Sequence, residues 1–387
     1  MKLSERILAV KPSATVSVSN KAKEMKAAGK PVISFSIGEP DLNSPECASR
    51  AAIEAIKRGE SHYTLNSGIT ELRKEVCKYY KERFNLDYAP DEVIIGAGAK
   101  PLLYSALQLL VNPGEEVILF APAWVSYAEQ LHLAGGKESL VDTIATDLTP
   151  TKEALEAAVT PKTVGMIINS PCNPTGVVYD EKTLRMIADV AKEHDLWIIF
   201  DEIYERLAYA PAKHVNLLNV APDVRDRVIT INGASKAYAM TGWRVGYALA
   251  PKEFIAKMNT IQTHLTSNAC SIAQWAALGA IREGEPDVEK MLAIFTERRR
   301  TIVDLIRDMP YLKVREPEGA FYIFVDIREC PLPDDMEFCT RLLEEKYVAA
   351  VPGTSFFAPG FVRFSYASSM ENIKEGMRRL KEFLQSL

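Results

Sequence analysis

The sequence predicts an α/β fold with a mostly parallel sheet and a second, smaller α+β part. Short runs rich in Val, Ile and Phe alternate with helix-period stretches through the middle of the chain. Near-continuous apolar strands separated by helices are typical of parallel sheets that are covered on both faces. The C-terminal part changes to long charged helices with a few strands, and 387 residues are enough for about two domains.

The expected elements follow in chain order. In the middle part we expect strands at 92–98, 115–121, 163–170, 196–200, 227–233 and 246–250, and helices at 99–111, 123–134 and 180–194. In the C-terminal part we expect a helix at 285–309, strands within 312–327 and 361–367, and helices at 335–346 and 370–385. A helix at 17–28 and a strand at 32–36 are expected to pack with the C-terminal part. The predicted domains are therefore a large one at 46–279 and a small one made of 1–45 and 280–387.

Composition and charge narrow the class of protein. The hydrophobic content of 47% and charged content of 25% are those of an ordinary soluble protein, and a net charge of −5 lacks the basic excess of nucleic-acid binding proteins. No apolar run approaches the roughly 20 residues that a membrane helix needs, and the N-terminus has no signal-peptide pattern. The six cysteines form no CxxC pair or Cys/His cluster. We therefore expect a cytoplasmic enzyme with free thiols and no metal site.

Two glycine-containing motifs follow expected strands, at the sheet edge where ligands bind in such folds. In "IIGAGAKPLL" (94–103) a strand ends in a glycine turn before a helix, which offers backbone N–H groups to a phosphate, although a purely structural turn is an equal alternative. "NGASKAYAMTGWRVGY" (232–247) holds Lys236 among small and aromatic residues, with Arg244 eight positions later. Apolar surroundings lower a lysine pKa, as an amine nucleophile requires, whereas a solvated loop lysine is the alternative.

Three further motifs supply an amide, a carboxylate and a guanidinium. "NSPCNPTG" carries Asn173, whose amide is able to donate to an oxygen anion or simply to form a turn. "WIIFDEIYE" places Asp201 directly after a buried strand and Tyr204 three residues later; such a carboxylate needs a cationic or N–H partner, or caps a helix. Arg363 in "GFVRFSYA" lies in an apolar strand, which indicates bidentate capture of a carboxylate from a ligand or from a structural partner.

Together these groups supply what pyridoxal phosphate requires. The cofactor needs a lysine for its Schiff base, a carboxylate at the pyridine nitrogen, donors for the ring O3′ and a phosphate site. A nicotinamide-dependent dehydrogenase would account for the glycine turn but not for Lys236, and Pro101 replaces the third glycine of that fingerprint. A regulator built on the same domain would need an added DNA-binding segment, and no basic helix-turn-helix region precedes residue 40.

With these residues in place, the chain resembles the class I aminotransferases of fold type I, most of all the bacterial subgroup of aspartate and prephenate aminotransferases. The resemblance covers essentially the whole chain through "KPSATVSV", "GEPD", "NSPCNPTG", "DEIYE", "SKAYAMTGWRVGYA", "GAFY", "VPGTSFF" and "RFSYA". It implies a large domain with a mostly parallel seven-stranded sheet, pyridoxal phosphate as the cofactor, and a homodimer with shared active sites.

The resemblance also implies a role for each motif. Lys236 would bind the cofactor aldehyde and later move the substrate Cα proton, and Asp201 would pair with the pyridine nitrogen. Tyr204 and Asn173 would donate to O3′. Trp124 in "APAWVSY" would stack on the ring, although an ordinary buried aromatic residue is the alternative.

Phosphate and substrate contacts are implied in the same way. The phosphate would be held by the following residues, the last from the neighbouring subunit: Gly98, Ala99, Lys100, Ser235, Arg244 and Tyr63. Many relatives carry a phosphate-binding serine where this chain has Gly233, which puts more weight on Ser235 and Arg244. The substrate α-carboxylate would be gripped by Arg363, the Gly38 backbone and Asn173, beside Trp124.

The substrate is expected to be L-aspartate, with 2-oxoglutarate as the amino acceptor. One branch of the family reads the distal carboxylate with an arginine in the stretch that matches 263–269, and none is present here. In the subgroup that this chain resembles, a lysine and a threonine bind the distal carboxylate, and Lys100 and Thr15 fit those positions. Lys11 could instead help to read a carboxylate of prephenate. The alternative is an aminotransferase acting on prephenate or arogenate, or on aromatic or other neutral amino acids.

Overall fold

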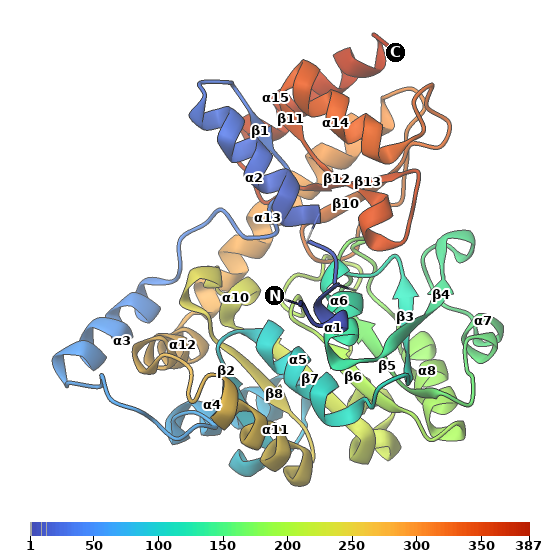
Figure 1. Cartoon of the computed structure of the whole chain (residues 1–387). Helices are drawn as coiled ribbons and strands as arrows, with labels where there is room; N and C mark the ends of the chain where they lie inside the picture. The colour runs from blue at the N-terminus through green and yellow to red at the C-terminus, as the bar shows by residue number, and fades with distance from the viewer. Residues whose placement is uncertain (1, 9, 13) are drawn as a thin grey trace.

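The computed structural model describes residues 2–8, 10–12 and 14–387, and its largest element is a seven-stranded sheet (Figure 1). The strand order is β2-β8-β7-β6-β5-β3-β4. The strands are β2 Val93–Gly96, β3 Glu116–Ala121, β4 Lys137–Asp142, β5 Thr163–Asn169, β6 Trp197–Asp201, β7 Val228–Gly233 and β8 Gly246–Leu249. Strand β8 is paired antiparallel with both β2 and β7, and the other four strand pairs are parallel, so the predicted mostly parallel sheet is confirmed.

Helices cover both faces of this sheet because its strands are apolar on both sides. Val117 and Ile199 pack on one face with Leu103 and other residues of α5 and α6. Their neighbours in sequence, such as Ile118 and Ile198, pack on the opposite face with α8. The helices of this part are α3 Glu46–Lys57, α4 Thr70–Phe84, α5 Ala99–Leu110, α6 Val125–Ala134, α7 Lys152–Ala157, α8 Glu181–Glu193, α9 Leu217–Val220, α10 Ala234–Ala237, α11 Lys252–Leu265 and α12 Ser271–Glu283.

Local sequence sets several helix ends. Asp180 caps α8, where its carboxylate accepts from the Thr183 backbone N–H at 2.8 Å. Gly135 ends α6 in the left-handed conformation (φ 88°), which glycine adopts without steric cost. In the C-terminal part, Ser369 caps α15 in the same way as Asp180 caps α8. These caps explain why α8 and α15 begin, and α6 ends, close to the residues that the sequence predicts.

The two ends of the chain form a second packed unit. A four-stranded antiparallel sheet has the order β12-β13-β10-β9, and β1 pairs in parallel with β11. The elements are α2 Ala14–Ala27, β1 Ile33–Ser34, α13 Glu285–Arg307, β9 Lys313–Val314, β10 Tyr322–Asp326, α14 Asp335–Lys346, β11 Val348–Ala349, β12 Val351–Pro352, β13 Phe361–Ser365 and α15 Met370–Leu384. The short helix α1 Glu5–Leu8 instead contacts α6 of the larger part (Figure 1). Figure 1 shows α2 beside these C-terminal elements, so the expected packing of the two ends is confirmed.

Several elements were missed in the sequence. The edge strand β4 has only two apolar residues, Leu140 and Val141, and is mostly accessible, so it lacks the apolar run that marked the other strands. Helices α3, α4, α11 and α12 were not assigned either, and α3 and α12 pack against each other. The predicted domain boundary at 279 falls inside α12, and the division into domains stays a prediction. Among the described residues, no helix combines the length and apolar composition needed to cross a membrane.

Candidate active site

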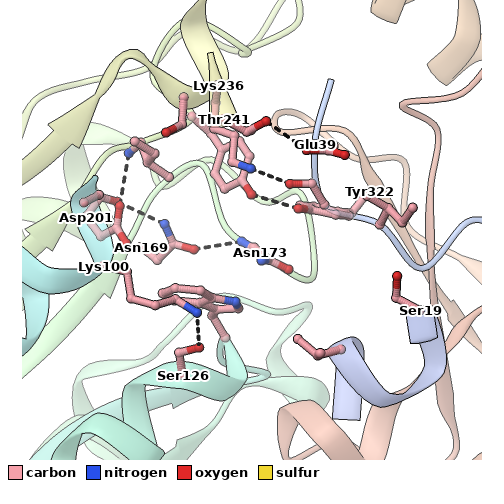
Figure 2. Close-up of a pocket in the computed structure, with 18 of the residues that line it drawn as sticks. Ser19, Glu39, Lys100, Ser126, Asn169, Asn173, Asp201, Lys236, Thr241 and Tyr322 are labelled. Atoms are coloured by element: carbon pink, nitrogen blue, oxygen red, sulfur yellow. Dashed lines mark hydrogen bonds between the residues drawn. The ribbon is translucent and has the colours of Figure 1, made fainter. Parts of the chain in front are cut away.

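A cavity of about 450 Å³ lies at the edge of the large sheet (Figure 2). The carboxyl ends of the parallel strands β3, β5, β6 and β7 all meet at this edge. Polar residues that follow these strands line the cavity: Trp124 after β3, Asn173 after β5, Asp201 at the end of β6, and Lys236 after β7. The C-terminal sheet adds Arg363 from the other side. Parallel topology therefore brings together side chains that are far apart in the sequence.

Lys236 projects into the cavity from the short helix α10. Its amine donates to the carbonyl oxygen of Gly38, and it lies 5.9 Å from the ring centre of Tyr204 and 5.6 Å from that of Phe321. Burial lowers the pKa of Lys236 to about 8, against an opposing effect of Glu39. A lysine with this pKa is partly neutral near neutral pH, so the amine is available as a nucleophile.

Asp201 is held as a buried carboxylate with hydrogen-bond donors on both oxygens. Only 3% of the residue is exposed. The Tyr127 hydroxyl donates to one carboxylate oxygen at 2.7 Å and the Ile203 backbone N–H donates to the other at 3.1 Å. Burial raises the pKa of Asp201 to about 6, although the Tyr127 hydrogen bond lowers it. This carboxylate would gain from a cationic partner in the cavity, because a positive charge would offset the cost of burying it.

Arg363 is almost fully buried and its guanidinium contacts four neighbouring groups. It donates to the side-chain oxygen of Asn173 at 2.8 Å and to the Ser36 carbonyl at 2.9 Å. The guanidinium carbon lies 4.3 Å from the Tyr322 ring centre and 4.9 Å from that of Phe356. Its Nε is buried without a hydrogen-bond partner among the described residues. A buried guanidinium with spare donor capacity is suited to binding a carboxylate.

A second anion-binding corner lies where α5 begins. Gly98 has φ 95°, and a Cβ at this position would overlap the Arg244 guanidinium, so the glycine lets that cation approach the helix N-terminus. Arg244 donates to the Thr241 carbonyl at 2.9 Å and lines the cavity with Ser235 and Ala99. Free backbone N–H groups, a hydroxyl and a guanidinium therefore converge, which are the groups that bind a phosphate.

Lys100 lies on the same helix and faces the cavity above Trp124. Its amine donates to the Ser126 hydroxyl at 3.1 Å and lies 4.7 Å from the Trp124 ring centre. Gln130 donates to the Lys100 carbonyl at 3.0 Å. Partial burial lowers the pKa of Lys100, and Arg244 lowers it further. The cavity thus has, besides Arg363, Arg244 and Lys236, a further cation for an anionic group of a ligand.

The structure brings most of the predicted site residues into this one cavity. Those that line it are Gly38, Ala99, Lys100, Trp124, Asn173, Asp201, Tyr204, Ser235, Lys236, Arg244 and Arg363. Gly98 lies just behind Arg244. Tyr63 is 89% exposed and does not line the cavity of its own chain. Lys11 is exposed as well, with its backbone N–H donating to Glu129 at 2.8 Å, and the Thr15 side chain lies outside the described part of the structure.

Sequence reasoning missed several side chains that complete the site. Tyr127 binds Asp201, and Asn169 accepts from the Asn173 backbone N–H at 2.8 Å while donating to the Asp201 carbonyl at 3.0 Å. Tyr322 contacts Arg363, and its hydroxyl lies 2.8 Å from that of Tyr204. A signal for Asn169 was present, since it opens the "NSPCNPTG" turn. Tyr127 and Tyr322 look like ordinary strand or helix aromatics, and only the tertiary structure reveals their contacts.

The cavity places a buried amine beside several cationic side chains, an arrangement that suits an anionic ligand. Residues 30–380 match the family described as aminotransferase class I and II, and the chain belongs to this family. It is 42% identical to aspartate aminotransferase of Geobacillus stearothermophilus, with 100% of both chains covered, and 41% identical to aspartate/prephenate aminotransferase of Cereibacter sphaeroides, covering 100% of this chain and 99% of that one. The solved structure of aspartate aminotransferase from Thermus thermophilus with maleate is 39% identical and superposes with a TM-score of 0.94 over 99% of each chain.

These comparisons confirm the predicted family and fold class. The protein is an aminotransferase enzyme, and its seven-stranded, mostly parallel sheet is that of the aminotransferase structures that it matches.

Proposed function

We propose that the cavity holds pyridoxal phosphate attached to Lys236. Three features fit this group: a buried amine with a lowered pKa, a buried carboxylate with a raised pKa, and a glycine, Gly98, that leaves room for the Arg244 guanidinium where α5 begins. Asp201 would pair with the pyridine nitrogen and Arg244 with the phosphate. When bound, the cofactor supplies an aldehyde for the amine and a ring that accepts the electron pair left when a substrate proton is removed.

The chain's own residues then bind the substrate and move one proton. Arg363 would hold the α-carboxylate, because its Nε is a buried donor without a partner among the described residues. Asn173, which accepts from Arg363, and Tyr204 both line the cavity and would donate to the cofactor oxygen. Lys236, once free of the cofactor, would carry the proton at the substrate Cα, since its lowered pKa allows it to act as a base near neutral pH. The same groups serve both halves of a ping-pong reaction.

We propose L-aspartate as the amino donor and 2-oxoglutarate as the acceptor. The observation that carries this proposal is that Lys100, a cation to which the cofactor assigns no role, faces the same cavity as Arg363. An acidic amino acid has two carboxylates, and one cation for each would favour it over neutral amino acids. The names of the Geobacillus and Thermus relatives support aspartate, and maleate in the Thermus structure is also a dicarboxylate. Prephenate with its amino product arogenate is the alternative, supported by the name of the Cereibacter relative.

An amino-donor screen with purified holoenzyme tests this proposal. Aspartate, alanine, leucine, phenylalanine and arogenate are compared as donors to 2-oxoglutarate and oxaloacetate. Lys100→Gln should lower kcat/KM for aspartate by about 10- to 100-fold, the effect of losing one charged hydrogen bond, while leaving alanine unchanged. Lys257→Gln, on the exposed face of α11, is the control. Equal use of aspartate and alanine by the wild-type enzyme would contradict the assignment of Lys100.

Three further properties are proposals as well. We propose a homodimer in which Tyr63 contacts the neighbouring subunit's phosphate site, because Tyr63 is 89% exposed and lies outside its own cavity. We propose a cytoplasmic location, which is supported by six free cysteines. We also propose a large domain at 46–279 and a small one at 1–45 and 280–387, in line with the two separate sets of sheets.

A further inference from the structure

Tyr322 contacts three groups that surround the proposed substrate position. It is 1% exposed and lines the cavity from β10. Its hydroxyl lies 2.8 Å from the Tyr204 hydroxyl, and its ring lies under the Arg363 guanidinium at 4.3 Å. A Cβ on Gly38 would lie 2.5 Å from the Tyr322 hydroxyl, so the backbone of that segment passes directly over it. Figure 2 shows Tyr322 among the side chains that line the cavity.

The hydroxyl groups of Tyr204 and Tyr322 form a hydrogen bond with one donor and one acceptor. Burial raises the pKa of Tyr204 and of Tyr322, so both phenols keep their protons near neutral pH. Each hydroxyl carries one hydrogen, so either tyrosine is able to donate the hydrogen bond and the other oxygen then accepts it. Among the described residues, Tyr204 is the hydrogen-bond partner of the Tyr322 hydroxyl. If the Tyr204 proton goes to a ligand in the cavity, the Tyr204 oxygen is left to accept from Tyr322.

We infer that Tyr322 is a positioning residue that donates to Tyr204 and thereby directs the Tyr204 proton to the O3′ oxygen of the cofactor. This inference rests on the proposed function, because it assumes pyridoxal phosphate in the cavity. Hydrogen bonds in a chain polarise one another, so a donor behind Tyr204 strengthens its donation to the next oxygen. The Tyr322 ring also packs against the Arg363 guanidinium. One residue therefore contacts both the proposed donor to the cofactor oxygen and the proposed α-carboxylate site.

The test is a spectroscopic pH titration of the holoenzyme. A hydrogen-bond donor that stabilises the O3′ anion lowers the pKa at which the cofactor–lysine chromophore loses its proton. Loss of that donor therefore raises the pH at the titration midpoint. Tyr204→Phe should raise the midpoint by about 1 to 2 pH units, as expected for one charged hydrogen bond. Tyr322→Phe keeps the ring under Arg363 and should raise the midpoint by about 0.2 to 0.6 unit, because polarisation is a fraction of a bond. Tyr209→Phe, a buried tyrosine outside the cavity lining, should leave it unchanged.

The double variant decides whether Tyr322 acts through Tyr204. With Tyr204→Phe already in place, Tyr322→Phe should add no further shift. A Tyr322→Phe midpoint equal to that of the wild type overturns the inference, and so does a shift that persists in full in the Tyr204→Phe background. A wild-type holoenzyme without a titrating chromophore on Lys236 would instead overturn the proposed function, and the inference with it.

A second measurement needs no cofactor. Gly38→Ala places a methyl group 2.5 Å from the Tyr322 hydroxyl and should lower the thermal unfolding midpoint of the cofactor-free protein. Tyr322→Phe removes the clashing oxygen, so the combined variant should unfold at a higher temperature than Gly38→Ala alone. Equal midpoints for Gly38→Ala with and without Tyr322→Phe would show that the hydroxyl does not lie under Gly38, which overturns the geometry on which the inference depends.

Discussion

Replacing Lys236 with methionine tests whether this amine is buried at a cost to the folded protein. Methionine has a similar unbranched side chain but carries no charge. The pKa of Lys236 falls from 10.5 to about 8 on folding. Between these two values the unfolded chain holds the proton that the folded chain has lost, so the free energy of unfolding rises with pH.

The magnitude follows from the two pKa values. For a fall from 10.5 to about 8, wild-type stability should rise relative to Lys236→Met by about 2.5 kcal/mol between about pH 7 and about pH 10. Taking the difference between the two proteins cancels the titration of all other groups. Urea unfolding of the cofactor-free proteins measures this difference, with Lys257→Met as the exposed control. A difference that stays flat across this range would refute a depressed pKa at Lys236.

Two other predictions concern residues that line the cavity, Arg363 and Tyr127. Arg363→Lys removes the planar fork of donors, so kcat/KM should fall about 100-fold or more for aspartate and for alanine alike. Lys100→Gln should instead lower kcat/KM for aspartate alone, and steady-state kinetics with both donors distinguish the two variants. A loss confined to aspartate in Arg363→Lys would contradict the role of Arg363. Tyr127→Phe removes a hydrogen-bond donor from Asp201 and should raise the Asp201 pKa above about 6 in the cofactor-free protein. The infrared band of the carboxyl group follows this titration. An unchanged titration would show that Tyr127 does not stabilise the carboxylate.

The sequence predicted the parts of the site that follow buried strands. The apolar runs before Asn173, Asp201 and Lys236 are strong strand signals, and parallel topology places the residues after them at one edge. Arg363 was recognisable because a guanidinium within an apolar strand needs a partner. These predictions depend on local pattern and a simple rule of topology, which one sequence is able to supply.

The remaining residues could not be predicted because their partners come from distant parts of the chain. Tyr127 reaches Asp201 across 74 positions, and Tyr322 reaches Tyr204 across 118. Nothing in the local sequence distinguishes them from core aromatics. The edge strand β4 was missed for a different reason: its outer side faces solvent, so it carries few of the apolar residues that identified its neighbours.

The most direct test of the central proposal is to locate the cofactor on the chain. The holoenzyme is reduced with borohydride, digested, and mapped by peptide mass spectrometry. The proposal predicts a reduced pyridoxal phosphate adduct on Lys236, and loss of both the yellow chromophore and the adduct in Lys236→Ala. An adduct on another lysine, such as Lys100, or a chromophore that survives in Lys236→Ala, would contradict it.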